Sequence, residues 1–267
     1  MEQVLREARE REATGSAAQG AVDTMVVNQE MSRRLSRPIC QDTGTPIFEV
    51  HYPVGWSTRK LAAQIKQAVT IATEKSYLRP NAVDAISGEN SGDNSGVEFP
   101  SIHFHEWDED AVKVDLMLKG GGCENVGAQY SLPNAQLKAG RDLEGVRRVA
   151  LDAVVKAQGQ GCAPGVLGIA VGGDRGASYA FSKHQLFRPL GDRNPDPELA
   201  ELEVTIKEQA NELGIGPMGF GGETTVLDVQ MDTMHRLPAS FFVSVSYMCW
   251  ANRRRSMTVR GEEVTYT

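Results

Sequence analysis

Apolar side chains recur with the period of an α-helix in several segments of the chain. The clearest segment covers residues 58–76, where Ser57 can cap the first turn. Its apolar stripe consists of Leu61, Ile65, Ala68, Val69 and Ala72. A second strong helix start is Asp196-Pro197, since aspartate caps a helix well and proline fits its first position. We expect helices over residues 1–11, 21–35, 58–76, 142–157, 177–186 and 197–213.

Alternation with a period of two predicts strands in other segments. Between residues 111 and 118 every second side chain is apolar, and we expect this segment to form a strand pair with residues 101–107. Further strands are expected over residues 46–52, 166–171, 225–231, 240–248 and 257–266.

Helices and strands mix along the chain without an internal repeat or a clear domain break. The predicted fold is therefore mixed α/β (α+β), with β-sheets flanked by helices and with Gly-rich turns between them. We expect one large domain over residues 1–267, of which residues 1–20 form an N-terminal helical extension.

Composition and charge narrow the class of function. The 267 residues are 40% hydrophobic and 24% charged, as in ordinary globular proteins. A net charge of −7 argues against nucleic acid as the main partner. No apolar run reaches the ~18 residues of a membrane helix, and the first 20 residues lack the apolar core of a signal peptide. We expect a cytoplasmic protein without a membrane or nucleic-acid partner.

The segment 37–45, RPICQDTGT, presents several reactive groups from one turn. A proline fixes the entry to the turn, and Gly44 permits a tight bend. A thiol, an amide and a carboxylate follow one another as Cys40, Gln41 and Asp42. Either this loop is functional, or Cys40 is a small buried hydrophobic residue.

Glycine-rich turns follow several of the predicted strands. Residues 119–125, KGGGCEN, offer backbone N–H groups and a lysine to an anion, and a carboxylate is the better-sized guest. The alternative is a plain β-to-α turn. This turn does not fit the Walker pattern, and the turn at 172–176 does not fit GxGxxG, so we expect no nucleotide site.

Three further features have two interpretations each. The polar loop 87–96, SGENSGDNSG, is either a flexible linker or a binding loop. His103 and His105 share a strand face and could ligate a metal, although satisfied strand histidines are the commoner case. The arginines at 253–255 form either a solvated face or a docking patch.

The cysteines at positions 40, 123, 162 and 249 form no CxxC pair, which disfavours a zinc ribbon or a thioredoxin-type site. Cys40, Cys162 and Cys249 lie in or beside turns that join apolar segments. Three thiolates would leave one iron of a [4Fe–4S] cluster without a cysteine ligand, and such an iron can act as a Lewis acid. The spacing by itself permits this cluster and does not require it.

An ordered set of motifs resembles one known family. The set is CQDTGT, YLRPN, NSGDN, KGGGCEN, GCAPG, NPDPELAELE, LGIGPMGFGG and SVSYMCW. It covers about residues 20–255 and resembles the class I iron–sulfur fumarase and tartrate dehydratase family. The match is to the α subunit of a two-subunit enzyme or to the N-terminal domain of the single-chain form.

The resemblance implies a [4Fe–4S] hydro-lyase that adds water to fumarate to give L-malate. By motif, Cys40, Cys162 and Cys249 match the cluster ligands. Asp42 is the implied acid or proton relay, and Arg79 is expected to grip a carboxylate. The implied substrate-binding set is Gln41, Asp42, Arg79, Lys119, Gly120, Gly121 and Gly122.

The same resemblance leaves part of the enzyme outside this sequence. In the family the catalytic base comes from a β subunit or C-terminal domain, which we expect as the partner, in a homodimer or a dimer of heterodimers. Leu237 stands near the position of a family histidine, with His235 close by, and Cys123 matches a non-ligand position. Tartrate or mesaconate dehydration shares every motif. A rival of another class is a non-catalytic module that binds small acids or phosphates through its glycine turns.

Overall fold

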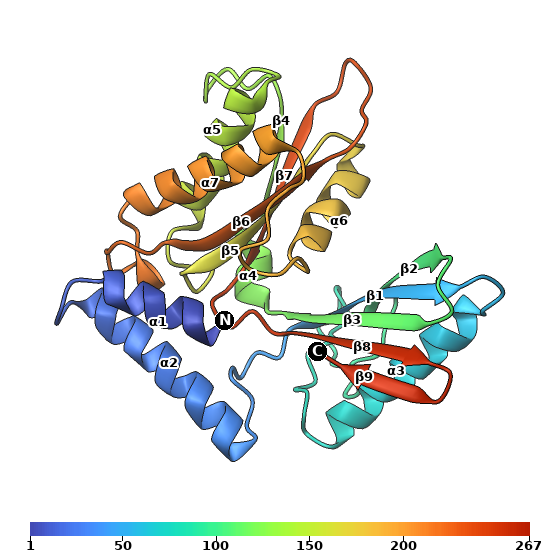
Figure 1. Cartoon of the computed structure of the whole chain (residues 1–267). Coiled ribbons are helices and arrows are strands. Elements are labelled where there is room, and N and C mark those ends of the chain that lie inside the picture. Colours follow the sequence, from blue (N-terminus) through green and yellow to red (C-terminus); the bar gives the residue numbers. More distant parts are fainter. The chain divides into compact units, whose positions relative to one another are not determined.

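The computed structural model describes the whole chain, residues 1–267, and divides it into two compact units (Figure 1). The first unit combines residues 1–37 with 122–251, and the second combines residues 38–121 with 252–267. Each unit builds helices onto a mixed sheet, which confirms the predicted mixed α/β class. The expectation of one domain rested on the lack of an internal repeat or a clear domain break in the sequence.

The first unit contains a four-stranded sheet in the order β4-β7-β5-β6. Strand β5 is parallel to β6 and antiparallel to β7, and β4 is antiparallel to β7. Every residue of β5 is buried, as expected for a central strand that is covered on both faces. The strands are β4 (Ala128–Ser131), β5 (Gly165–Val171), β6 (Val226–Thr233) and β7 (Phe242–Met248).

Helix α6 covers one face of this sheet, and α5 and α7 cover the other (Figure 1). On the α6 face, the hydroxyls of Ser182 and Ser246 lie 2.7 Å apart, and such small side chains let helix and sheet approach closely. On the other face, the Tyr130 hydroxyl donates to Asp152 of α5 over 2.7 Å. The helices of this unit are α1 (Glu2–Arg11), α2 (Ala17–Leu35), α4 (Gly121–Asn125), α5 (Leu143–Ala157), α6 (Arg175–Gln185) and α7 (Pro197–Glu212), with the 3₁₀ turn η1 (Pro217–Gly219).

A buried glutamate fixes α7 against the edge strand β6. Glu203 is fully buried and accepts hydrogen bonds from the Met231 N–H (2.8 Å), the Asn194 N–H (3.1 Å) and the Arg188 guanidinium (2.9 Å). A buried carboxylate is tolerated only when it is paired and hydrogen-bonded in this way. The start of α7 is capped by Asp196, as predicted.

The first helix belongs to the body of the first unit. Leu5 and Ala8 of α1 are completely buried, and α1 packs along α2. Just beyond α1, Glu12 accepts a hydrogen bond from the Glu223 N–H over 2.9 Å. The expected N-terminal extension, residues 1–20, therefore supports the loop that precedes β6.

The second unit is a five-stranded sheet in the order β2-β1-β3-β8-β9. Helix α3 (Thr58–Glu74) covers one face with Leu61, Ile65 and Val69, which pack against Phe48 and Val50 of β1. Burial of this apolar stripe confirms the predicted helix and its Ser57 cap. The strands are β1 (Thr45–Pro53), β2 (Ser101–Trp107), β3 (Val112–Lys119), β8 (Arg254–Arg260) and β9 (Glu263–Tyr266).

The predicted pairing of strand 101–107 with strand 111–118 is wrong. Both strands form, but β1 lies between them, parallel to β2 and antiparallel to β3. Helix α3 provides the long crossover that a parallel β1–β2 pair requires, which leaves the other edge of β1 for β3.

Other boundaries differ for local reasons. Helix α2 begins at Ala17 because Ser16 accepts a hydrogen bond from the Gln19 N–H and caps it. The last expected strand, 257–266, is instead the hairpin of β8 and β9, which turns at Gly261 with a φ of 59°. Strand β4 has only four residues, which is too short for a clear period-two pattern, and it was not predicted. None of the helices combines the length and apolar character needed to cross a membrane.

Candidate functional site

The topology of the first unit brings two cysteines to the same end of its sheet. Cys162 precedes β5 and Cys249 follows β7, and these strands are antiparallel with Val166 opposite Met248. The start of one strand therefore lies beside the end of the other. The Trp250 N–H donates to the Cys162 carbonyl over 3.4 Å, which ties the two cysteine segments together.

A third thiol reaches the same end of the sheet from α4. Strand β4 runs antiparallel to β7, so Cys123, five residues before β4, lies near the end of β7. A Cβ on the neighbouring Gly122 would lie 3.6 Å from the Gln160 carbonyl oxygen, which places α4 against the loop of Cys162. All four cysteines are thiols; Cys123 is buried and Cys162 and Cys249 are half-buried. The thiols of Cys123, Cys162 and Cys249 are called here the sulfur end of the first unit.

The turn 214–222 supports the Cys162 loop through backbone contacts. The Met218 N–H donates to the Ala163 carbonyl over 2.9 Å. A Cβ on Gly159 would lie 2.5 Å from the Met218 backbone carbon, so only glycine permits this approach. Cys162 itself has a φ of 58°, in the left-handed region. The GIGPMGFGG motif therefore shapes the loop that presents this thiol.

Tyr247 lies at the centre of the sulfur end. Its side chain is 3% exposed, and its hydroxyl has no hydrogen-bond partner. A Cβ on Gly165 would overlap the tyrosine hydroxyl, and a Cβ on Gly161 would lie 2.6 Å from the ring. Burial raises the pKa of the Tyr247 hydroxyl, and the neighbouring thiols of Cys249, Cys123 and Cys162 raise it further. This tyrosine was not among the residues expected from the sequence.

In the second unit, Asp42 holds the Cys40 loop through several hydrogen bonds. Its Oδ1 accepts from the Gly44 N–H (2.9 Å) and from the Asn81 amide (3.3 Å). Its Oδ2 accepts from the Gly121 N–H over 2.7 Å. The carboxylate therefore joins the CQDTGT, RPN and KGGG motifs. The resemblance implied that residues of these three motifs bind the substrate.

The segment that carries Arg79 is fixed by a buried asparagine. The Asn94 side chain is 2% exposed; its oxygen accepts from the Asn81 N–H (2.7 Å) and the Ala82 N–H (3.2 Å). Its amide donates to the Arg79 carbonyl and to the Thr73 hydroxyl, each over 2.9 Å. Loop 87–96 therefore holds the Arg79 segment in place through hydrogen bonds. The interpretation of this loop as a flexible linker is wrong.

A cavity of about 270 Å³ opens in the second unit between the Cys40 loop and the end of α3. Cys40, Gln41 and Arg79 all contribute to its lining, and Gln41 and Arg79 are exposed. The structure thus brings together one expected ligand and two expected substrate residues. An arginine fork and an amide at the mouth of a small cavity suit a carboxylate.

The glycines and the lysine of the KGGG motif differ in their surroundings. Strand β3 ends at Lys119 and α4 begins at Gly121, which confirms a β-to-α turn. Lys119 is 2% exposed, so its charge is buried within the protein. The Gly121 N–H is already used by Asp42, whereas Gly122 is exposed.

Sequence reasoning missed the role of Arg253. Its Nη1 donates to the Asp42 carbonyl over 2.6 Å. Arg253, which directly precedes β8, therefore stabilises the Cys40 loop. Arg254 is half-buried, and burial lowers its pKa. Only Arg255 of the triplet is exposed. The three arginines therefore do not form a single solvated face. The role of Arg253 depends on its tertiary contact with Asp42, which the sequence does not show.

The histidines of the sequence pattern have local partners. His103 lies 3.1 Å from the Ser101 hydroxyl, and His105 lies 2.6 Å from the Glu49 carboxylate and stacks on His51. No group of three or more histidine, cysteine, aspartate or glutamate side chains forms a metal-ion site in either unit. His235 is exposed on the loop before β7.

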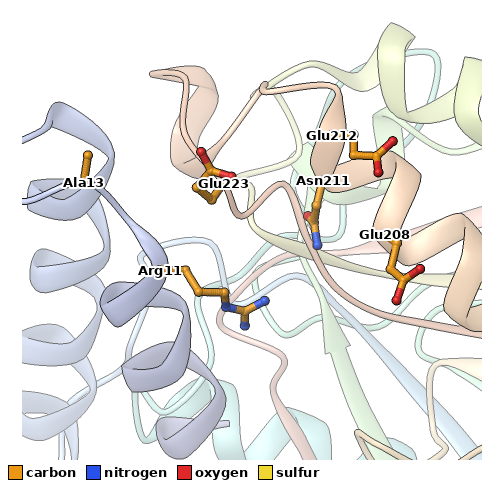
Figure 2. A pocket seen from close by; sticks show the side chains of 6 residues that line it. All are labelled: Arg11, Ala13, Glu208, Asn211, Glu212 and Glu223. Atoms are coloured by element: carbon orange, nitrogen blue, oxygen red, sulfur yellow. The ribbon is translucent and has the colours of Figure 1, made fainter.

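The first unit also contains a larger cavity of about 510 Å³ beside α7. Figure 2 shows Arg11 reaching from the end of α1 toward the face of α7 that carries Glu208 and Glu212. Asn211, on the same face, is occupied by backbone hydrogen bonds from Thr225 and Val226. Because carboxylates dominate its wall, this cavity does not suit a dicarboxylate.

Comparison with known proteins decides the family. Residues 1–258 match the family model described as fumarate hydratase (fumerase). The chain belongs to the fumarate hydratase family. Within the family, a Geobacillus stearothermophilus protein assigned by name to class I fumarate hydratase is 51% identical over 253 residues, which are 94% of this chain and 49% of that protein. The chain thus spans about half the length of this relative.

Two-subunit members of the family are also similar. An Escherichia coli K12 protein named L(+)-tartrate dehydratase subunit alpha is 32% identical over 257 residues, covering 93% of this chain and 81% of that protein. A Methanocaldococcus jannaschii protein, also assigned by name to that subunit, is 34% identical over 94% of this chain and 87% of its own length. Family membership confirms the resemblance that the motifs carried.

We predict that Asn94→Gly destabilises the second unit by about 3 kcal/mol, because several buried polar groups lose their partner at once. Glycine keeps the left-handed backbone of this residue, whose φ is 60°. Asn90→Gly, in the same loop, is the matched control, since Asn90 is exposed and bonds the Pro80 carbonyl and the Gly92 N–H. Urea unfolding measures both, and equal losses in the two variants would contradict the assigned role.

Proposed function

We propose that this chain is the cluster-binding part of a class I hydro-lyase that interconverts fumarate and L-malate. Family membership and the name of the Geobacillus relative support the reaction. The observation that carries the proposal is the convergence of thiols at one end of the first unit's sheet, with Cys40 beside a carboxylate-sized cavity in the second unit.

Cys40, Cys162 and Cys249 are proposed to hold a [4Fe–4S] cluster. Thiolates are the donors that such clusters take. The buried Tyr247 hydroxyl supports this assignment, because it has no hydrogen-bond partner and lies near the thiols of Cys249 and Cys162. When bound, the cluster would supply a Lewis acid for the hydroxyl that leaves malate. Cys123 is proposed as a buried non-ligand.

The CQDTGT, RPN and KGGG motifs are proposed to bind the dicarboxylate. Arg79 would grip one carboxylate with its planar fork, and Gln41 would donate from the same cavity mouth. The backbone N–H groups of Gly120 and Gly122 would hold the other carboxylate, while Lys119 adds positive charge from within.

Asp42 is proposed to work mainly by position. It holds the Gly121 N–H and the Cys40 loop in one arrangement, as its three hydrogen bonds indicate. A carboxylate in that place can also assist as a general acid or proton relay.

The principal base is proposed to come from a partner. The chain spans about half of the Geobacillus relative, and the other relatives are named as alpha subunits. We propose a β subunit or C-terminal domain that takes the C3 proton, within a homodimer or a dimer of heterodimers. We place the enzyme in the cytoplasm, where thiols that bind iron stay reduced.

Tartrate is the second candidate substrate. The names of the Escherichia coli and Methanocaldococcus relatives favour it, and mesaconate is a third diacid of the same size class. The rival of another class, a non-catalytic module that binds small acids or phosphates, would need no cluster. Cluster loading therefore separates the enzyme from the module, and turnover separates the substrates.

We predict that anaerobic incubation with iron and sulfide gives a brown protein with about four iron atoms and four sulfides per chain. Cys40→Ser, Cys162→Ser and Cys249→Ser should each lose most of the colour and iron, because each removes one ligand. Cys123→Ser is the matched control and should keep both. Equal iron content in all four variants would refute the ligand assignment.

We predict that the loaded chain alone hydrates little or no fumarate, because the principal base is proposed to come from the partner. Addition of the proposed partner polypeptide should restore turnover, with Arg79→Gln raising the KM for the diacid. Fumarate, L-tartrate and mesaconate are compared by absorbance under anaerobic conditions. Full activity of the loaded chain without a partner would disprove the proposal that the partner supplies the base.

A further inference from the structure

Tyr247 carries a buried hydroxyl that the proposed chemistry does not use. Its hydroxyl lacks a hydrogen-bond partner although its side chain is 3% exposed. Leaving such a group unsatisfied destabilises the folded protein. Natural interiors satisfy nearly all such groups, so this hydroxyl needs an acceptor.

The surroundings of the ring determine where the acceptor lies. Tyr247 stands opposite Leu167 of β5, and its ring extends over Gly161 and Gly165, the glycines that flank Cys162. Any side chain at Gly165 would overlap the hydroxyl. The two glycines therefore make room for the tyrosine ring against the Cys162 loop.

Cysteine sulfurs lie near the hydroxyl, although none accepts a hydrogen bond from it in this structure. Cys249 lies two residues along the chain, beyond the end of β7, and Cys162 lies between the two glycines that the ring covers. Electrostatic coupling of the hydroxyl to Cys249, Cys123 and Cys162 agrees with this placement. The other buried tyrosine of the sheet, Tyr130, is satisfied by Asp152 instead.

We propose that the Tyr247 hydroxyl donates a hydrogen bond to a cluster-bound cysteine thiolate, Cys162 or Cys249, and thereby tunes the cluster. This inference rests on the proposed function, because it needs a cluster at the sulfur end. Tyr247 is a positioning residue that acts through sulfur and does not touch the substrate. Hydrogen bonds to cluster sulfurs raise the reduction potential, since they stabilise the more negative reduced state.

The test compares Tyr247→Phe with the unaltered chain after anaerobic loading with iron and sulfide. The variant should hold the same iron and sulfide but show a more negative midpoint potential. Its Fe–S(Cys) Raman bands should also lose part of their shift in D₂O. Tyr130→Phe, which removes a buried hydroxyl bonded to Asp152, should leave the potential and the Raman bands unchanged.

A second substitution keeps the shape of the ring in case phenylalanine impairs folding. Incorporation of 3-fluorotyrosine at position 247 gives a stronger donor and should shift the potential in the positive direction. Equal potentials in all loaded proteins would overturn the role of Tyr247 and leave the proposed function intact. If the unaltered chain takes up no cluster, both proposals fail.

Discussion

The antiparallel pairing of β5 with β7 is the constraint on which the candidate site depends. Val166 lies opposite Met248, so the residues just before β5 and just after β7 must meet at one end of the sheet. The same end receives α4 through β4 and the turn 214–222 through β6, which is parallel to β5. Thiols far apart in the sequence thus share one neighbourhood because of strand order.

Glycine at a few positions lets this end of the sheet close tightly. Gly159 meets the Met218 backbone, and Gly161 and Gly165 give room to Tyr247. In the second unit, Asp42 plays a comparable organising role through hydrogen bonds to Gly44, Asn81 and Gly121. One unit relies on close backbone contact, and the other relies on a carboxylate that joins separate loops.

Periodicity predicted most elements because burial of one helix face or strand face is a local requirement. The α3 stripe and the capped start of α7 both formed as expected. Pairing failed where it depended on a distant partner: β1 separates β2 from β3, and no local signal shows this. The division into two units was also missed, because each unit is assembled from segments that are far apart in the sequence.

Sequence motifs pointed to three residues that line one cavity, whereas residues that act only through tertiary contacts were missed. Cys40, Gln41 and Arg79 share a cavity, as the motifs implied. Tyr247 and Arg253 were missed because a tyrosine in a strand and an arginine in a basic run look ordinary until their neighbours are known. The support from Asn94 likewise depends on tertiary hydrogen bonds.

The most direct test of this account is an anaerobic crystal structure of the chain loaded with iron and sulfide. We predict one cubane cluster whose irons bind the Sγ atoms of Cys40, Cys162 and Cys249, with one iron left without a cysteine. A cluster ligated by Cys123, or a Cys40 sulfur remote from the metal, would contradict it.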